Sequence, residues 1–329
     1  SDNDGSLDGD EISRKYDPLD AANYPYLGNI SGVTIDGINV NSDGWVYFSG
    51  DTVILNSVTV APGVRLMVDR DTSLTFNDSS LIANPNSPIF MRSSGSGVGR
   101  VGFSNSKVAY ANIKLAIAFE LDSGSTLSRS DVSVSTSFQY YGTIQDSLLK
   151  IYSSIWMWDG GKLLHSYLTA DSTVFMLGEI QFSRQVGTGH VYNSGGVISH
   201  SVIDDLTGNG TIRNSIINRF NSNGSIRESD VALYDYGRTW AALFDGSYLT
   251  TLDGIASYGG LGTPSDTIGD GVAETAFSLG GNDYLVDGIK NPRSTPNFPN
   301  GEDDLWNPNG VGVLWDKNDP DTFPDPLAP

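Results

Sequence analysis

Apolar and polar residues alternate along much of this chain in short runs, as in Val132-Ser133-Val134. Alternation with a period of two, in segments rich in β-branched and aromatic residues, predicts short β-strands with one buried side. The repeated region has no sustained apolar series at i, i+3, i+4 and i+7, so helices are not expected there. The pattern therefore predicts an all-β fold.

A short phrase recurs between residues 124 and 231. It consists of a glycine, a small or polar residue, an aliphatic residue, two variable residues, a serine and a further hydrophobe. After a looser copy at Gly124, the copies begin at Gly142, Gly161, Gly178, Gly196, Gly210 and Gly224. Successive serines are 14 to 19 residues apart, and a unit this short buries a core only by stacking on copies of itself.

Stacking predicts a structural role for the glycine and the serine that recur in each copy. The glycines are expected at corners that require a positive φ angle. The serines are expected to form one column of hydroxyl groups that bond neighbouring backbone or one another. Ser57, Ser79 and Ser106 continue this column at longer intervals.

The repeat resembles the right-handed parallel β-helix proteins of the pectate-lyase-like superfamily over residues 51–236. The resemblance implies a single-stranded right-handed parallel β-helix. It does not fix an activity, since that superfamily includes lyases, hydrolases, phage spikes and adhesins. Residues 24–50 are expected to form cap strands. Residues 237–329 are expected to form an irregular segment that packs on the β-helix and ends in an exit linker.

The first eleven residues match an EF-hand-type calcium loop from its second position onward. The match resembles the calcium repeats of thrombospondin type 3 and dockerin proteins, although the first ligand is missing. An acidic leader with chance spacing is the alternative. We expect residues 1–23 to form a truncated calcium repeat and linker in which calcium has a structural role. The candidate ligands are Asp2, Asp4, Ser6, Asp8 and Glu11.

Composition narrows the classes of partner. The net charge is −20, with only 19 basic residues, which argues against nucleic acid and anionic lipid surfaces as partners. No run of 18 or more apolar residues occurs, so no membrane insertion is expected. The absence of cysteine excludes disulfides and thiol catalysis. We expect a bacterial protein, secreted or at the cell surface, that is a monomer as a fragment of a larger chain.

Charged candidates for a site are few. Asp204 and Asp205 form the only paired carboxylate within the repeats. Arg213 and Arg227 share a phrase position, so we expect them one coil apart, where two guanidinium groups could clamp carboxylates of an anionic polymer. The alternative is that Arg213, Arg227, Glu228 and Asp204 are solvated surface charges.

Aromatic residues are the clearer candidates for carbohydrate binding. Trp156 and Trp158 alternate with Ile155 and Met157, which puts both indoles on one side of a strand. Outward indoles, with Tyr152 and Tyr167 in adjacent coils, could stack on sugar rings. Alignment with Val174 and Met176 of the next coil favours inward indoles instead.

Two functions are consistent with this sequence. The first is a non-catalytic extracellular module for adhesion or polysaccharide binding within a larger secreted or surface protein. The alternative is a polysaccharide lyase or glycoside hydrolase acting on an acidic or neutral polysaccharide. The enzyme would need long loops that shape a cleft, and the repeats have few, so we favour the binding module.

Overall fold

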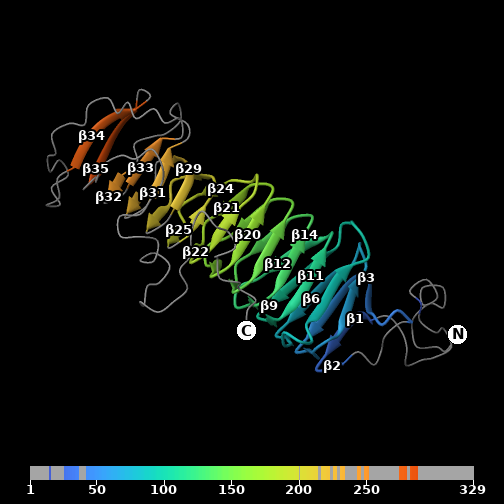
Figure 1. Ribbon diagram of the computed structural model, residues 1–329. Helices are drawn as coiled ribbons and strands as arrows, with labels where there is room; N and C mark the ends of the chain where they lie inside the picture. Colours follow the sequence, from blue (N-terminus) through green and yellow to red (C-terminus); the bar gives the residue numbers. More distant parts are fainter. Residues whose placement is uncertain are drawn as a thin grey trace. The chain divides into compact units, whose positions relative to one another are not determined.

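The computed structural model describes Lys15, residues 26–36, 42–199 and 201–213, and a set of strands beyond them (Figure 1). These residues divide into two compact units, one within residues 1–156 and one within residues 157–325. The described residues contain strands, turns and bends but no helix. The predicted all-β parallel solenoid is confirmed.

In the first unit, each coil contributes one strand to each of three parallel ladders. The first ladder contains β5 (Arg65–Val68), β8 (Ile89–Ser93), β11 (Ala111–Leu115), β14 (Asp131–Val134) and β17 (Leu148–Ile151). The second contains β6 (Ser73–Asn77), β9 (Arg100–Ser104), β12 (Ala118–Leu121) and β15 (Phe138–Tyr140). The third contains β2 (Thr34–Ile35), β4 (Thr59–Val60), β7 (Ser80–Ile82), β10 (Lys107–Ala109), β13 (Thr126–Ser128) and β16 (Thr143–Gln145).

The first coils begin before the expected boundary at residue 51. Strand β3 (Val46–Asn56) is long enough to serve two ladders, because residues 46–48 pair with β5 and residues 52–56 pair with β6. Strand β1 (Tyr26–Ser31) pairs in parallel with β3, and β2 pairs with β4. Residues 24–50, expected as a cap, therefore carry strands of the ladders themselves.

The second unit repeats the same succession of three strands, and the division between the units falls in β18 (Ile155–Met157). The strands that follow the first-ladder pattern are β20 (Tyr167–Ala170), β23 (Arg184–Val186) and β26 (Val202–Ile203). Those that follow the second are β21 (Val174–Met176), β24 (Val191–Asn193) and β27 (Leu206–Gly208). Those that follow the third are β19 (Lys162–Leu164), β22 (Glu179–Gln181), β25 (Val197–Ser199) and β28 (Thr211–Arg213).

Strand pairing continues past the expected boundary at residue 236. Strand β29 (Ile216–Ser222) pairs with β26, β27 and β31 (Asp230–Leu233), and β31 pairs with β33 (Tyr248–Thr251). After β28, the third-ladder pattern is continued by β30 (Ser225–Arg227), β32 (Leu243–Asp245) and β35 (Asn282–Asp287). Strand β34 (Glu274–Leu279) pairs antiparallel with β35. Part of the segment expected to be irregular is thus β-structure.

The core of the first unit contains a column of aromatic rings. Phe76, Phe103, Phe119 and Phe138 occupy inward positions of the second-ladder strands, Phe48 lies in the part of β3 that pairs with β5, and all five are buried. Neighbouring rings lie 5.0 to 6.4 Å apart between centroids, in stacked or edge-to-face arrangements. Because such ring pairs add stabilisation beyond buried area, they fix the register of one coil on the next.

The serines form two columns instead of the single column expected. Ser130 and Ser147 occupy the corner between the third and first ladders, where the Ala111 and Ser130 N–H groups donate to the Oγ atoms of Ser130 and Ser147 at 3.1 and 3.2 Å. The same bond joins the Ser183 N–H to the Ser201 Oγ in the second unit, at 3.2 Å. The predicted bonding of serine hydroxyls to neighbouring backbone is confirmed.

Ser79 and Ser106 lie at a different corner, between the second and third ladders, together with Ser125. The Ser79 N–H donates to the Ser106 Oγ at 3.0 Å, and the Ser106 N–H donates to the Ser125 Oγ at 3.1 Å. The prediction that Ser57, Ser79 and Ser106 continue the later serine column is therefore wrong. Serine occurs at both corners, so the spacing between serines in the sequence does not determine which corner a given serine occupies.

Two glycines of the phrase, Gly142 and Gly178, have a different role from the one predicted, whereas Gly124 has the expected positive φ, 79°. The left-handed corner conformation is adopted by the residue before the serine, with φ of 48° at Asp146 and 45° at Phe182. A Cβ at Gly142 would lie 2.4 Å from the Ser125 carbonyl oxygen, and one at Gly178 would lie 2.1 Å from the preceding coil's backbone. These glycines are required because successive coils approach closely, not because φ is positive.

Candidate functional site

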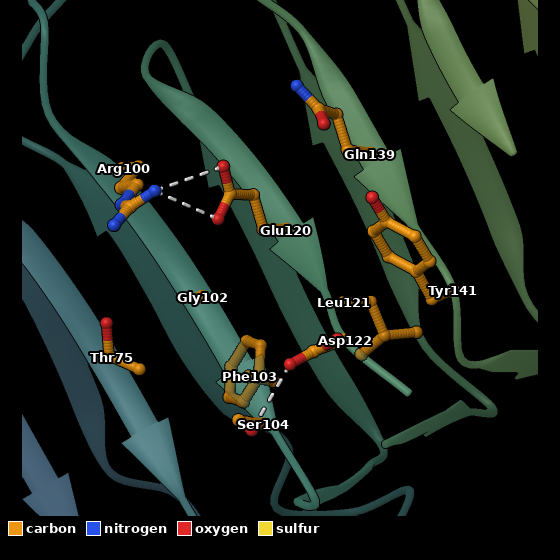
Figure 2. A pocket seen from close by; sticks show the side chains of 10 residues that line it. All are labelled: Thr75, Arg100, Gly102, Phe103, Ser104, Glu120, Leu121, Asp122, Gln139 and Tyr141. Carbon is orange, nitrogen blue, oxygen red and sulfur yellow. Dashed lines mark hydrogen bonds and ion pairs between the residues drawn. The ribbon is translucent and has the colours of Figure 1, made fainter. Parts of the chain in front are cut away.

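A hollow of about 340 Å³ lies on the outer surface of the second ladder of the first unit (Figure 2). It is centred on Gly102 of β9, whose ladder neighbours are Thr75 of β6 and Glu120 of β12. Both neighbours carry outward side chains, whereas Gly102 carries none. A single glycine on this face of the ladder thus opens a depression between two side chains.

Two pairs of side chains bound the hollow. The Arg100 guanidinium donates to the Glu120 carboxylate, with N–O distances of 3.4 and 3.3 Å, across neighbouring coils. The Ser104 hydroxyl donates to the Asp122 carboxylate at 3.4 Å. Figure 2 shows both pairs at the two ends of the same stretch of β9 and β12. Glu120 and Asp122 are two residues apart, which separates their Cα atoms by roughly 6.6 Å along an extended strand.

Gln139 and Tyr141 complete the hollow from the next coil. Gln139 is the ladder partner of Glu120, and Tyr141 follows at the end of β15. Tyr141 is 41% exposed, so part of its ring faces solvent. Amide, guanidinium, hydroxyl and carboxylate groups together offer several donors and acceptors beside one aromatic ring. Such an arrangement suits a polyhydroxylated ligand, and the volume is near the lower end for small-molecule sites.

The sequence did not single out the residues of this hollow. One local signal was present, because Gly102 interrupts the β-strand Val101-Gly102-Phe103. A glycine inside a strand often marks a bulge or a place where another group approaches closely. The charged and aromatic neighbours come from three coils, and only the register of those coils brings them together.

The Trp156 indole does not point into the core. Ile155 and Met157 are each 1% exposed, whereas Trp156 between them is half-buried on the outer side. Val174 and Met176 are the equivalent inward residues of β21. The preference for inward indoles is wrong because Val174 and Met176 correspond to Ile155 and Met157, one position away from the tryptophans.

The other aromatic candidates also reach the surface. Tyr152 of the first unit is 45% exposed. Trp158 and Tyr167 of the second unit are half-buried, and the Arg184 guanidinium lies 5.8 Å from the centre of the Tyr167 ring. Binding of sugar by Trp156, Trp158, Tyr152 and Tyr167 stays a prediction.

The charged candidates belong to different strands of a coil. Asp204 and Asp205 form the turn between β26 and β27, where the Asp204 N–H donates to the Gln185 side chain at 3.1 Å. Arg213 and Arg227 are in register in β28 and β30, as the repeat predicts. The structure describes only the backbone of these two arginines. A polymer-binding role for the four residues stays a prediction.

The metal-ligand candidates Asp2, Asp4, Ser6, Asp8 and Glu11 lie outside the described residues. Within the described residues, no group of three or more His, Asp or Glu side chains is arranged to hold a metal ion. The described part of the chain also contains no helix long and apolar enough to cross a membrane.

The chain matches no known protein family, no curated protein and no solved structure.

Proposed function

We propose that this chain is a non-catalytic extracellular module that binds a polysaccharide, with the hollow at Gly102 as its sugar-binding site. The hollow is the observation that supports this proposal, because it combines missing side-chain volume with polar groups on every side. Adhesion within a larger secreted or surface protein, a pectate-lyase-like ancestry and a structural calcium site in residues 1–11 are part of the same proposal.

The chemistry of the hollow favours a neutral sugar. The carboxylates of Glu120 and Asp122 can accept hydrogen bonds from sugar hydroxyls, and the amide of Gln139 can both donate and accept. The exposed part of Tyr141 offers a flat apolar surface for the C–H face of a pyranose ring. Two carboxylates in one small site would repel a uronate, so the ligand we expect there carries hydroxyls and no charge.

A polysaccharide lyase or glycoside hydrolase is the alternative, supported by the two outward carboxylates of one strand. Their Cα atoms are roughly 6.6 Å apart along the extended chain, so the two carboxylates lie on the same side of it. We favour binding because Glu120 is paired with Arg100, and Asp122 with Ser104. The turns that join the described strands of the first unit are also short, so few loops are available to enclose a substrate.

The test is a binding and product assay with the whole chain and a panel of neutral polysaccharides. Retention in affinity electrophoresis without reducing ends or unsaturated products supports the binding module. Glu120→Gln is expected to weaken retention about ten-fold, because the ligand loses one or two charge-assisted hydrogen bonds to the carboxylate. Glu179→Gln is the matched control, because it removes a similar inter-coil ion pair to Lys162, at 3.4 Å, on another face.

Three results would count against the proposal. Product release that Glu120→Gln or Asp122→Asn abolishes would establish the enzyme instead. Equal loss of retention in Glu120→Gln and Glu179→Gln would show that the hollow is not the site. Failure to retain any neutral polysaccharide would remove the binding function.

A further inference from the structure

Basic side chains line up on the outer surface of the first ladder. The register of β8, β11, β14 and β17 places Arg92, Lys114, Ser133 and Lys150 in one line across four successive coils. The three basic residues are exposed, and each step between neighbouring strands is about 4.8 Å. We call these four residues the cationic column.

The cationic column has no ion-pair partner among the described residues. The described ion pairs involve other basic residues, namely Lys15, Arg70, Arg100, Arg129 and Lys162. Asp131, on the neighbouring position of the same ladder, accepts a hydrogen bond from Asn112 at 3.2 Å. Among the described residues, the three cations of this column thus have no ion-pair partner, although the chain has 39 acidic residues and a net charge of −20.

Like charges lie next to each other at one end of the column. Arg92 and Lys114 are direct ladder partners, and like charges in directly opposite positions repel each other. The Arg92 guanidinium lies 5.7 Å from the Trp45 ring, and the Arg65 guanidinium lies 4.1 Å from the same ring. A second guanidinium therefore extends the positive charge at this end of the column.

The column has one neighbouring aromatic ring. Tyr152 follows Lys150 at the end of β17, is 45% exposed, and has the Lys150 ammonium 5.2 Å from its ring centre. The Ser133 hydroxyl lies in the line between Lys114 and Lys150. Ammonium and guanidinium groups bind carboxylates and sulfates, while a hydroxyl and a phenol ring suit the sugar between two such groups.

We infer that the cationic column binds a single chain of a polyanionic polysaccharide that runs across the strands of the first ladder. The column is one charge wide and its positions follow the strand spacing, with a serine at the third, so it fits a linear polymer that carries carboxylates or sulfates. A nucleic acid is less suited, because three cations and one ring in a strongly acidic chain offer few phosphate contacts and few stacking surfaces.

This inference goes beyond the proposed function, because the surface and the ligand both differ. The hollow lies on the second ladder and suits neutral sugar, whereas the cationic column lies on the first ladder and suits an anionic polymer. A module with both surfaces could hold two chemically distinct polysaccharides at once.

The test uses three probes with one backbone: dextran, carboxymethyl-dextran and dextran sulfate. The whole chain is expected to bind the two charged probes more tightly than dextran at low salt, with an excess affinity that falls as salt is raised. Lys114→Gln/Lys150→Gln is expected to weaken this binding about ten-fold, since two charge-assisted contacts are lost. The control Lys107→Gln/Lys162→Gln makes the same change in net charge on the third-ladder strands β10 and β19.

The outcomes separate this inference from the proposed function. Binding of only one charged probe identifies the carboxylate or the sulfate as the partner group. Absence of binding to both charged probes, or an equal loss in the control variant, would overturn the inference. Tighter binding of a single-stranded DNA oligonucleotide would assign the column to nucleic acid instead. The variants of the column leave the hollow intact, so retention on neutral polysaccharide tests the proposed function independently.

Discussion

Replacement of Gly102 by threonine is expected to stabilise the protein and abolish binding at the hollow. Gly102 has no positive φ, and a Cβ there would meet its nearest neighbours, Thr75 and Glu120, at 3.8 to 4.0 Å. These are ordinary contacts. Thr75 already occupies the equivalent position one coil earlier, so a threonine fits this ladder. The added side chain would extend into the hollow that the ligand is proposed to occupy.

The expected gain in stability follows from strand propensity. Glycine costs roughly 0.5 to 1 kcal/mol in a strand interior, and β-branched residues are at the favourable end of a scale that spans about 1 kcal/mol. We therefore expect Gly102→Thr to raise the free energy of unfolding by about 0.5 to 1 kcal/mol, or the thermal midpoint by about 1 to 4 °C.

The contrasting variant is Gly142→Ala. A Cβ at Gly142 would lie 2.4 Å from the Ser125 carbonyl oxygen and 2.8 Å from that of Asp122. Both are backbone atoms of a packed coil, so relief of the overlap requires the coils to separate, at a cost of about 1 to 3 kcal/mol. Two single substitutions at glycine should therefore shift stability in opposite directions.

The assay combines differential scanning fluorimetry, urea unfolding and affinity electrophoresis on the polysaccharide that the unmodified chain retains. A raised midpoint with lost retention is the expected result for Gly102→Thr. If Gly102→Thr has as low an unfolding midpoint as Gly142→Ala, the conclusion that position 102 has room for a side chain is wrong. If its stability rises and retention persists, the hollow is not the binding site.

Four further predictions concern the core, the corners and the leader. Phe119→Ala should lower the free energy of unfolding in urea by about 3 to 5 kcal/mol, because it interrupts the buried ring column. Ser130→Ala should cost about 1 to 3 kcal/mol and speed hydrogen exchange at the Ala111 amide, which loses its acceptor. Burial raises the pKa of the Tyr140 phenol, so the folded protein keeps this phenol neutral while the unfolded chain ionises above about pH 10. The free energy of unfolding should therefore fall above about pH 10, and Tyr140→Phe should flatten this fall in thermal scans. Calorimetric titration should detect calcium binding that Asp4→Asn weakens, and absence of heat would refute a functional loop.

The sequence predicted the strands and the stacking because both depend on local order along the chain. Alternation decides which residues of a strand face inward, as Ile155 and Met157 illustrate. A repeat of fewer than twenty residues cannot bury its hydrophobic residues by itself, so successive repeats must stack. The predicted serine bonds also followed, since a small hydroxyl at a corner can reach the backbone of the adjacent coil.

The tertiary structure alone decided how residues of different coils meet. The corner occupied by Ser106, the close approach at Gly142, the hollow at Gly102 and the line from Arg92 to Lys150 all depend on register between coils. Coil lengths vary, so equal spacing in the chain does not identify equivalent positions. Backbone hydrogen bonds and the stack of phenylalanine rings fix the register, and these interactions exist only once the coils lie on one another.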